Sequence, residues 1–228
     1  MTFAAAVVFL SVLDTLLVVF LILPAIRRRR RRTALLRNAD TRIRPHFVFN
    51  ALHSIAALVS DDPDSAARMT ARLTELVREG FSEPAMPVIR LCDEAAFVRN
   101  YAEIEEVRFS DRLVVHWNLR PDVLHAAVPR MCLQPLVENA IRHGLSAHES
   151  CVATIEAFRI RSQLCVAVSN EAGDGGAASR PPHESFGIGL STVRDRLEAV
   201  HGTRAQLQLY RTEHSARAIL TLPYAELD

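Results

Sequence analysis

The chain contains no lysine, although it has 27 basic side chains against 26 acidic ones, so every one of its cations apart from histidine is arginine. This absence excludes three kinds of site that depend on lysine: the P-loop, the strand lysine of protein kinases and the Schiff-base site. Any phosphate chemistry in this chain must therefore use arginine, backbone N–H groups and metal.

Cysteine is also scarce, and its spacing is uninformative. The four cysteines are Cys92, Cys132, Cys151 and Cys165, and no two of them form a Cys-x-x-Cys pair. Nothing in this spacing indicates a metal site or a redox motif. We expect small core residues, kept reduced in a cytoplasmic setting.

Only one long apolar run is present, residues 3–23, and the six consecutive arginines Arg27–Arg32 follow it. At 1.5 Å per residue the run spans about 30 Å, the thickness of a hydrocarbon core. The positive-inside rule then places the N-terminus outside and the rest of the chain in the cytoplasm. We predict a single-pass membrane anchor over residues 1–26. Residues 27–32 form a basic juxtamembrane run suited to anionic membrane lipids.

Two features of charge qualify this picture. Asp14, the one formal charge in the run, fits either a protonated carboxyl bonded to Thr15 or a polar contact with a partner helix. Without the six arginines, 21 basic side chains remain against 26 acidic ones. The part outside the membrane is thus mildly acidic, which argues against direct nucleic-acid binding.

Two amphipathic helices follow the anchor. The first is predicted over residues 34–60, and Asp64 is a suitable N-cap for a second that runs to about Arg78 and ends at Gly80. The first helix carries a heptad-like apolar seam made of Val48, Leu52, Ile55 and Val59. Such a hairpin buries little apolar surface alone, so pairing with a second copy into a four-helix bundle, a homodimer, is expected.

His46 lies away from that seam. Asn50 and His53 share its helical face, and Pro45 is expected to bend the helix just before it. This arrangement suits a solvent-facing nucleophile on a rigid helix. We regard His46 as the functional histidine and His53 as incidental.

The rest of the chain alternates between helical and strand patterns. Residues 91–109 form a helix that, on its own pattern, is solvated, and residues 171–184 are too rich in glycine and proline for a regular element. Strands are predicted at 113–118, 152–158, 163–169, 205–210 and 216–222, and helices at 135–143 and 189–200. The fold class is therefore α+β.

Two segments of this part suit phosphate chemistry. Pro135 fits the first position of a helix in which Asn139 offers an amide oxygen, a hard ligand suited to Mg²⁺. Arg142 lies three residues further on, on the same face, and is able to bind phosphate oxygens. Gly187-x-Gly189 permits close backbone approach to a phosphate and opens a helix whose N-terminus favours anions.

Three segments in this order resemble the LytS/AlgZ-type sensor histidine kinases of two-component systems: Arg44–Asn50, Pro135–Gly144 and Gly187–Leu197. The resemblance runs from about residue 33 to 222. It implies an N-terminal transmembrane helix (1–26) in the inner (cytoplasmic) membrane of a bacterium. After the basic run, it implies a helical-hairpin dimerisation and histidine domain (33–82). A connecting helix (83–110) and a GHKL (Bergerat) α/β-sandwich ATP-binding domain (111–228) follow.

The resemblance also implies roles for individual residues. His46 is the phosphoacceptor, Glu138 the candidate general base, and Asn139 the ligand of a Mg²⁺ that bridges the phosphates of ATP. The other implied nucleotide-binding residues are Arg142, His143, Asn170, Gly187, Gly189 and Leu190. The implied function is autophosphorylation of His46 from Mg-ATP, followed by transfer to an aspartate in the receiver domain of a response regulator, often one with a LytTR-type DNA-binding domain.

Alternatives remain at this point. Asn170 stands where the superfamily usually has an aspartate that binds adenine, and Asp174-Gly175 is a substitute only after a shift of four residues. This departure favours an ATP-binding pseudokinase, or a scaffold or phosphatase of the regulator. A GHKL-type ATPase is opposed by Pro135, which occupies the place of the water-activating glutamate in hydrolytic relatives. A pure dimerisation module would not need Gly187–Gly189. The input signal and the choice between transfer within one chain or between two are not determined by the sequence.

Overall fold

The computed structural model describes residues 44–81, 86–172, 188–212 and 215–227. The chain divides into two compact units, residues 1–40 and 41–228, and all described residues belong to the second. Among them, no helix combines the length and the apolar character needed to cross a membrane. The predicted anchor at residues 1–26 and the basic run at 27–32 lie outside the described residues.

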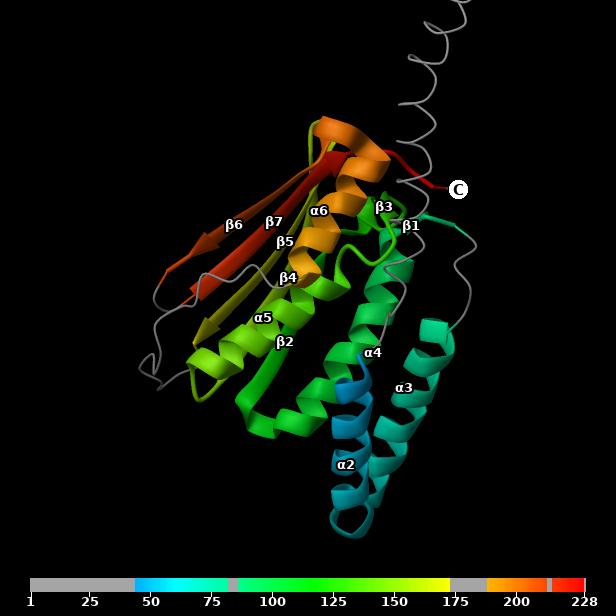
Figure 1. Ribbon diagram of the computed structural model, residues 1–228, viewed down its shortest axis with the longest axis vertical. Coiled ribbons are helices and arrows are strands. Elements are labelled where there is room, and N and C mark those ends of the chain that lie inside the picture. The colour runs from blue at the N-terminus through cyan, green and yellow to red at the C-terminus, as the bar shows by residue number, and fades with distance from the viewer. Residues whose placement is uncertain (1–43, 82–85, 173–187, 213–214, 228) are drawn as a thin grey trace, which may run out of the picture. The chain divides into compact units, whose positions relative to one another are not determined.

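The described part begins with a helical hairpin, α2 (Pro45–Asp61) and α3 (Pro63–Phe81) (Figure 1). Arg44 is extended, with φ −70° and ψ 131°, so α2 begins at Pro45 and does not continue through it. The expectation of a helix bent at Pro45 was therefore wrong. Proline takes the first helical position, where its missing N–H costs nothing.

The second helix of the hairpin also begins and ends differently from the prediction. The side chain of Asp62, not Asp64, accepts the backbone N–H of Ser65 at 3.0 Å and so caps α3. The helix passes through Gly80 and reaches Phe81, so Gly80 does not end it.

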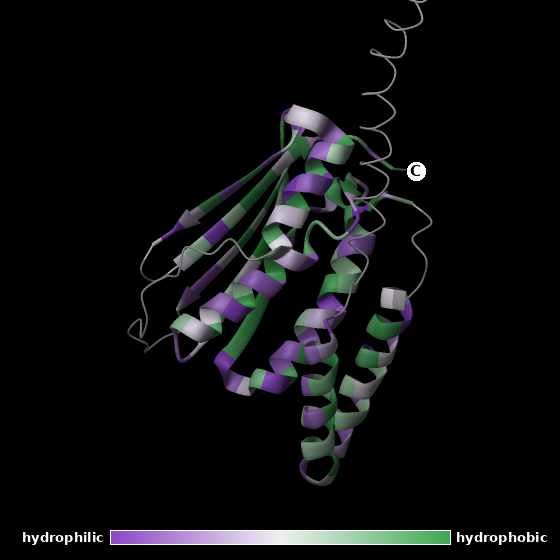
Figure 2. Cartoon of the chain, in the orientation of Figure 1, coloured by the Kyte–Doolittle hydropathy of each residue, from purple (hydrophilic) through white to green (hydrophobic). Residues whose placement is uncertain are grey.

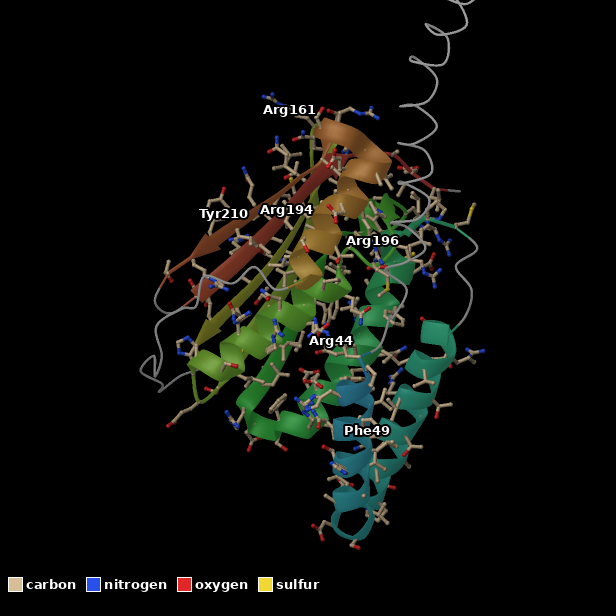
Figure 3. The ribbon with its side chains drawn as sticks, viewed as in Figure 1. Arg44, Phe49, Arg161, Arg194, Arg196 and Tyr210 are labelled. Carbon is tan, nitrogen blue, oxygen red and sulfur yellow. The ribbon has the colours of Figure 1, made fainter. Side chains whose placement is uncertain are left out.

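The predicted seam of α2 is divided by the structure. Val48 and Ile55 pack against the hydrophobic core, whereas Leu52 and Val59 are 48% and 57% exposed. Phe49 is 62% exposed and points outward from α2 (Figure 3). Phe49, Leu52 and Val59, which we call the α2 stripe, follow a 3-and-7 spacing and lie on one side of the helix.

Helix α4 (Leu91–Phe109) has the predicted bounds but not the predicted exposure. It lies between the α2–α3 hairpin and strand β2 (Leu113–Leu119), and it contacts both (Figure 1). Even polar side chains of α4, such as Glu94, Asn100 and Glu105, are buried. The helix is therefore part of the core and is not solvated, contrary to what its own pattern predicts.

A mixed five-stranded sheet forms the other layer of the described part. Its order is β2-β4-β5-β7-β6; β2 pairs with β4 in parallel and the other pairs are antiparallel. The remaining strands are β4 (Cys151–Ile160), β5 (Gln163–Ala172), β6 (Gln206–Arg211) and β7 (Ser215–Pro223). All five predicted strands are confirmed, each within a few residues.

Helices α5 (Gln134–Ala147) and α6 (Ile188–His201) cover one face of this sheet and contact each other (Figure 1). Strand β6 alternates between hydrophilic and hydrophobic residues (Figure 2). Residues of the central strands such as Ile155, Leu164 and Leu220 are fully buried. Three of the four free cysteines are buried, as predicted, whereas Cys92 is partly exposed.

Two short strands were not predicted, β1 (Val88–Arg90) and β3 (Ala127–Pro129), which pair with each other. Three residues are too few for a recognisable alternation.

Candidate active site

Helix α5 carries candidate residues on two of its faces. Glu138, Ile141, Arg142 and Leu145 line a cleft of about 370 Å³ that α5 forms with α2 and α4. Asn139 and His143 line a different pocket, between α5 and the sheet. We call the first the histidine cleft, because His46 lines it, and the second the sheet-side pocket.

His46 is exposed near the N-terminal end of α2. The Nδ2 atom of Asn50 lies 3.1 Å from the Nδ1 atom of His46, which confirms that these residues share a face. Because the Asn50 amide engages Nδ1, the ring has Nε2 left for chemistry. His53 does not line the cleft.

Two contacts fasten this end of α2 to the neighbouring helices. The Phe47 ring packs on the Tyr101 ring of α4, with centroids 4.9 Å apart. The Nη1 atom of Arg44 lies 2.9 Å from Oε1 of Glu138 on α5. The segment that carries His46 is therefore held against both α4 and α5 of the same chain.

Two carboxyl groups face the histidine cleft. Burial raises the pKa of Glu138, and the nearby guanidinium groups of Arg44 and Arg142 oppose this. Glu105 is only 4% exposed; Arg108 lies 3.0 Å from its Oε2, but its Oε1 has no hydrogen-bond partner among the described residues. Burial raises the pKa of Glu105 to about 7; Arg108 opposes this and the Glu138 charge adds to it. The cleft thus holds a group that exchanges a proton near neutral pH.

The sheet-side pocket is lined by Asn139 and His143 of α5, Asn170 of β5 and Leu190 of α6. It encloses about 30 Å³, far less than typical ligand pockets. Burial lowers the pKa of His143, and Arg142 and Arg211 add to this effect. His143 is therefore neutral at neutral pH, a hydrogen-bonding group and not a cation.

Asn170 is buried and already bonded at both ends of its amide. Its Nδ2 donates to the carbonyl oxygen of Ala140 at 2.9 Å, and its Oδ1 accepts the N–H of Ala216, also at 2.9 Å. Asn170 therefore ties β5 to α5 and β7. To accept a hydrogen bond from the amino group of adenine, Asn170 would have to use the second lone pair of Oδ1.

The predicted set of nucleotide residues is divided between the two faces of α5. The structure brings Asn139, His143, Asn170 and Leu190 together, and it places Arg142 in the histidine cleft with Glu138. Gly187 lies outside the described residues.

Gly189, in the first turn of α6, lies beside the first turn of α5 and near the guanidinium group of Arg44. A Cβ atom at this position would lie 3.4 Å from Cβ of Pro135, at the start of α5. It would lie 3.9 Å from Nη2 of Arg44, just before α2. Since helix N-termini favour anions, this meeting point is suited to phosphate groups.

Sequence reasoning did not assign a role to Arg44, and it missed the part that Tyr101, Glu105 and Arg108 play in the cleft. Glu105 and Arg108 do have a signal, an i,i+3 pair of opposite charge. Arg44 has none, because only its contact with Glu138, 94 positions further along, sets it apart from the other arginines.

A helical hairpin docked on a helix-covered mixed sheet is the arrangement that the sequence motifs predict for a histidine kinase. Comparison with known proteins agrees. The histidine kinase family matches residues 34–113. The sensor protein LytS of Staphylococcus saprophyticus is 27% identical over 207 residues, 86% of this chain and 35% of that protein. The sensor histidine kinase BtsS of Escherichia coli K12 is 32% identical over 161 residues, 70% of this chain and 28% of that protein.

The chain thus belongs to the LytS-type sensor histidine kinases, and it spans about a third of the length of these curated relatives. Among solved structures, the histidine kinase domain of a blue-light activated kinase from Erythrobacter litoralis is 19% identical. The match covers 85% of this chain and 94% of that one, at a TM-score of 0.45, which is too weak to add to the assignment.

Proposed function

We propose that this chain transfers the γ-phosphoryl group of Mg-ATP to His46 and then passes it to an aspartate in the receiver domain of a response regulator. The observation that carries the proposal is that His46 shares a cleft with Glu138 and Arg142 of α5, while the opposite face of α5 presents Asn139. Helix α5 therefore lies between His46, the proposed nucleophile, and the sheet-side pocket, in which we expect the nucleotide.

Each residue has a chemical role in this proposal. Nε2 of His46 attacks phosphorus, an N–P bond forms, and the bond to the departing ADP oxygen breaks. Glu138 accepts the imidazole proton, a role that its raised pKa supports. Arg142 neutralises phosphate charge. Because the transition state of phosphoryl transfer is loose, positioning and charge neutralisation account for most of the catalysis.

The residues present fit a magnesium ion that is held mainly by the nucleotide. No cluster of three or more His, Cys, Asp or Glu side chains suited to a metal occurs in the described part of the chain. Asn139 supplies one hard oxygen, and Mg²⁺ commonly takes few protein ligands beside phosphates and water. When bound, the ion neutralises charge that develops on the phosphate oxygens.

The domain over residues 111–228 is assigned, as a proposal, to the GHKL (Bergerat) type. The regulator is proposed to be of the LytTR type, and residues 1–26 are proposed to anchor the kinase in the membrane, with residues 27–32 on anionic lipid. These assignments rest on the order of the sequence motifs.

The test of the kinase proposal is incubation of the full chain, in lipid vesicles, with Mg²⁺ and γ-labelled ATP. We expect acid-labile, alkali-stable label on the wild type and on His53→Gln, and none on His46→Gln. His53 is a matched control because it is an exposed histidine two turns further along α2. Label that survives in His46→Gln would contradict the assignment of the phosphoacceptor.

A pseudokinase or regulator scaffold is the second candidate, and one observation favours it. Both ends of the Asn170 amide are used in hydrogen bonds within the protein. This candidate predicts that no label appears on His46, whether or not a calorimeter detects ATP binding.

We also propose that the chain forms a homodimer through the α2 stripe of Phe49, Leu52 and Val59. These three large apolar side chains are exposed in the single chain, and a second copy would cover them. Leu52→Glu is expected to convert the protein in detergent from dimer to monomer by light scattering. Ala57→Glu, an exposed change on α2 outside the stripe, should leave the dimer intact. A Leu52→Glu dimer would exclude this interface.

A further inference from the structure

We propose that Arg44 is a positioning residue that docks His46 onto helices α5 and α6 of its own chain, so that phosphoryl transfer takes place within one chain. This inference rests on the proposed kinase function. It assigns a role to Arg44, a residue outside the predicted site. It also decides between phosphorylation of His46 by the catalytic domain of its own chain and by that of the partner chain.

The first observation is that one guanidinium reaches both helices. Nη1 of Arg44 lies 2.9 Å from the carboxylate of Glu138 on α5. Nη2 lies 3.9 Å from where a Cβ atom on Gly189 of α6 would be placed. Figure 3 shows Arg44 at the N-terminal end of α2. Arginine suits such a bridge because its planar fork binds two partners in fixed geometry.

The second observation is the short, stiff connection from Arg44 to His46. Arg44 is extended, Pro45 takes the first position of α2, and His46 follows. Two residues span at most about 7 Å, and the proline ring fixes φ at position 45. A guanidinium held at Glu138 therefore confines His46 to the same edge of α5.

A third contact prevents rotation of the docked segment. The Phe47 side chain is 8% exposed and packs on Tyr101 of α4. Arg44 and Phe47 thus flank His46 in the sequence and anchor it to two different helices. All of these partners belong to the chain that carries His46.

The contribution of the Arg44–Glu138 pair is positional. The Arg44 side chain is 50% exposed, and ion pairs so exposed add little to stability. Gly189 stands in the first turn of α6, where phosphate oxygens are favoured by the backbone N–H groups. A phosphate at that place meets Nη2 of Arg44, while Nη1 keeps its contact with Glu138.

Dimerisation does not compete with this docking. The α2 stripe of Phe49, Leu52 and Val59 is exposed, whereas Arg44 and Phe47 turn toward α4 and α5. A second copy is therefore able to cover the stripe while each His46 stays against its own α5.

The first test mixes two inactive chains. His46→Gln and Asn139→Asp chains, carrying different affinity tags, are co-expressed, and complexes that hold both tags are isolated and given γ-labelled ATP. We expect no label, because the intact histidine and the intact Asn139 helix are on different chains. Label on the Asn139→Asp chain overturns the inference. Wild-type complexes purified with the same two tags must be labelled; if they are not, the kinase proposal itself fails.

The second test addresses Arg44 in the full chain. We expect Arg44→Gln to lower the labelling rate at saturating ATP about tenfold, because a displaced nucleophile is costly, with a smaller change in the KM for ATP. Arg44→Lys keeps the charge, so its labelling rate should be at most about threefold below that of the wild type, against the tenfold loss in Arg44→Gln. Arg78→Glu, far along α3, is the control and should label like the wild type. A wild-type rate for Arg44→Gln, or an effect on KM alone, overturns the positioning role.

Discussion

The carboxylate of Glu94 accepts the backbone N–H of Met131 at 2.9 Å. Its other oxygen accepts the N–H of Leu133 at 3.0 Å. On the opposite side, Nη1 of Arg196 in α6 donates to the carbonyl oxygens of Arg130 and Met131, each at 3.1 Å. Helices α4 and α6 thus hold the segment that leads into α5, and so they set the direction in which α5 presents Glu138 and Asn139.

Glu94→Gln is therefore expected to be costly although it is isosteric. The amide has one oxygen for two buried N–H donors, and its own NH₂ group would face one of them. We expect the free energy of unfolding in urea to fall by about 1–3 kcal/mol. Glu103→Gln, which breaks only a surface pair with Arg72, should cost less than about 1 kcal/mol. Equal losses for the two variants would contradict the proposed role of Glu94.

Glu105 should make stability depend on pH in an unusual direction. Burial raises its pKa in the folded protein from 4.5 to about 7. The folded state therefore retains a proton that the unfolded state has already lost between these pH values. Relative to its ionised form, the protonated Glu105 side chain adds about 3 kcal/mol to the free energy of unfolding below about pH 4.5. This contribution is lost as the pH rises to 7.

The measurement is urea unfolding of the wild type and Glu105→Gln at several pH values from 4 to 8. The glutamine cannot ionise, so the variant should gain stability relative to the wild type as the pH rises. A difference between the two proteins that stays constant over this range would show that Glu105 does not hold the proton.

Asn170→Asp tests whether the carboxylate usual in the superfamily is tolerated here. The substitution removes the Nδ2 donor and places a carboxylate oxygen against the carbonyl oxygen of Ala140. We expect a loss of about 1–3 kcal/mol in the free energy of unfolding and no gain in ATP affinity by calorimetry. Asn118→Asp on the exposed side of β2 is the control. A stable Asn170→Asp protein with tighter ATP binding would show that Asn170 weakens an otherwise ordinary nucleotide site.

Gly144 is expected to be irreplaceable in α5. A Cβ atom there would lie 2.2 Å from Sγ of Cys151 and 3.0 Å from Nδ2 of Asn170, so both buried side chains would have to move. We expect Gly144→Ala to lower the free energy of unfolding by about 1–3 kcal/mol. Cys151→Ala in the same chain should recover part of it, because Sγ is then gone.

Gly202→Ala provides a matched comparison. Its φ of +62° is unfavourable for alanine, but no atom lies within 4 Å of the added Cβ. Its cost is therefore conformational alone, about 1 kcal/mol, and Cys151→Ala should not relieve it. Relief of the Gly202→Ala loss by Cys151→Ala would show that the recovery is not specific to the clash.

The strands and the helices α5 and α6 were predictable because their patterns are local. Strand β4 alternates inward and outward residues along most of its length, and Pro135 lies in the first turn of α5. The exposure of α4 was not predictable, because Glu94 and Glu105 look like solvent-facing charges until the hairpin and the sheet cover them.

By itself the sequence determined the order of the elements and the family, and it singled out His46, Glu138 and Asn139 as candidate site residues, because periodicity and short motifs depend on neighbours in the chain. Only the tertiary structure decided that Glu138 and Asn139 face different pockets, that Asn170 is bonded at both ends, and that Arg44 reaches α5 and α6. Those relationships join residues tens of positions apart. They depend on how the helices pack, which local sequence does not specify.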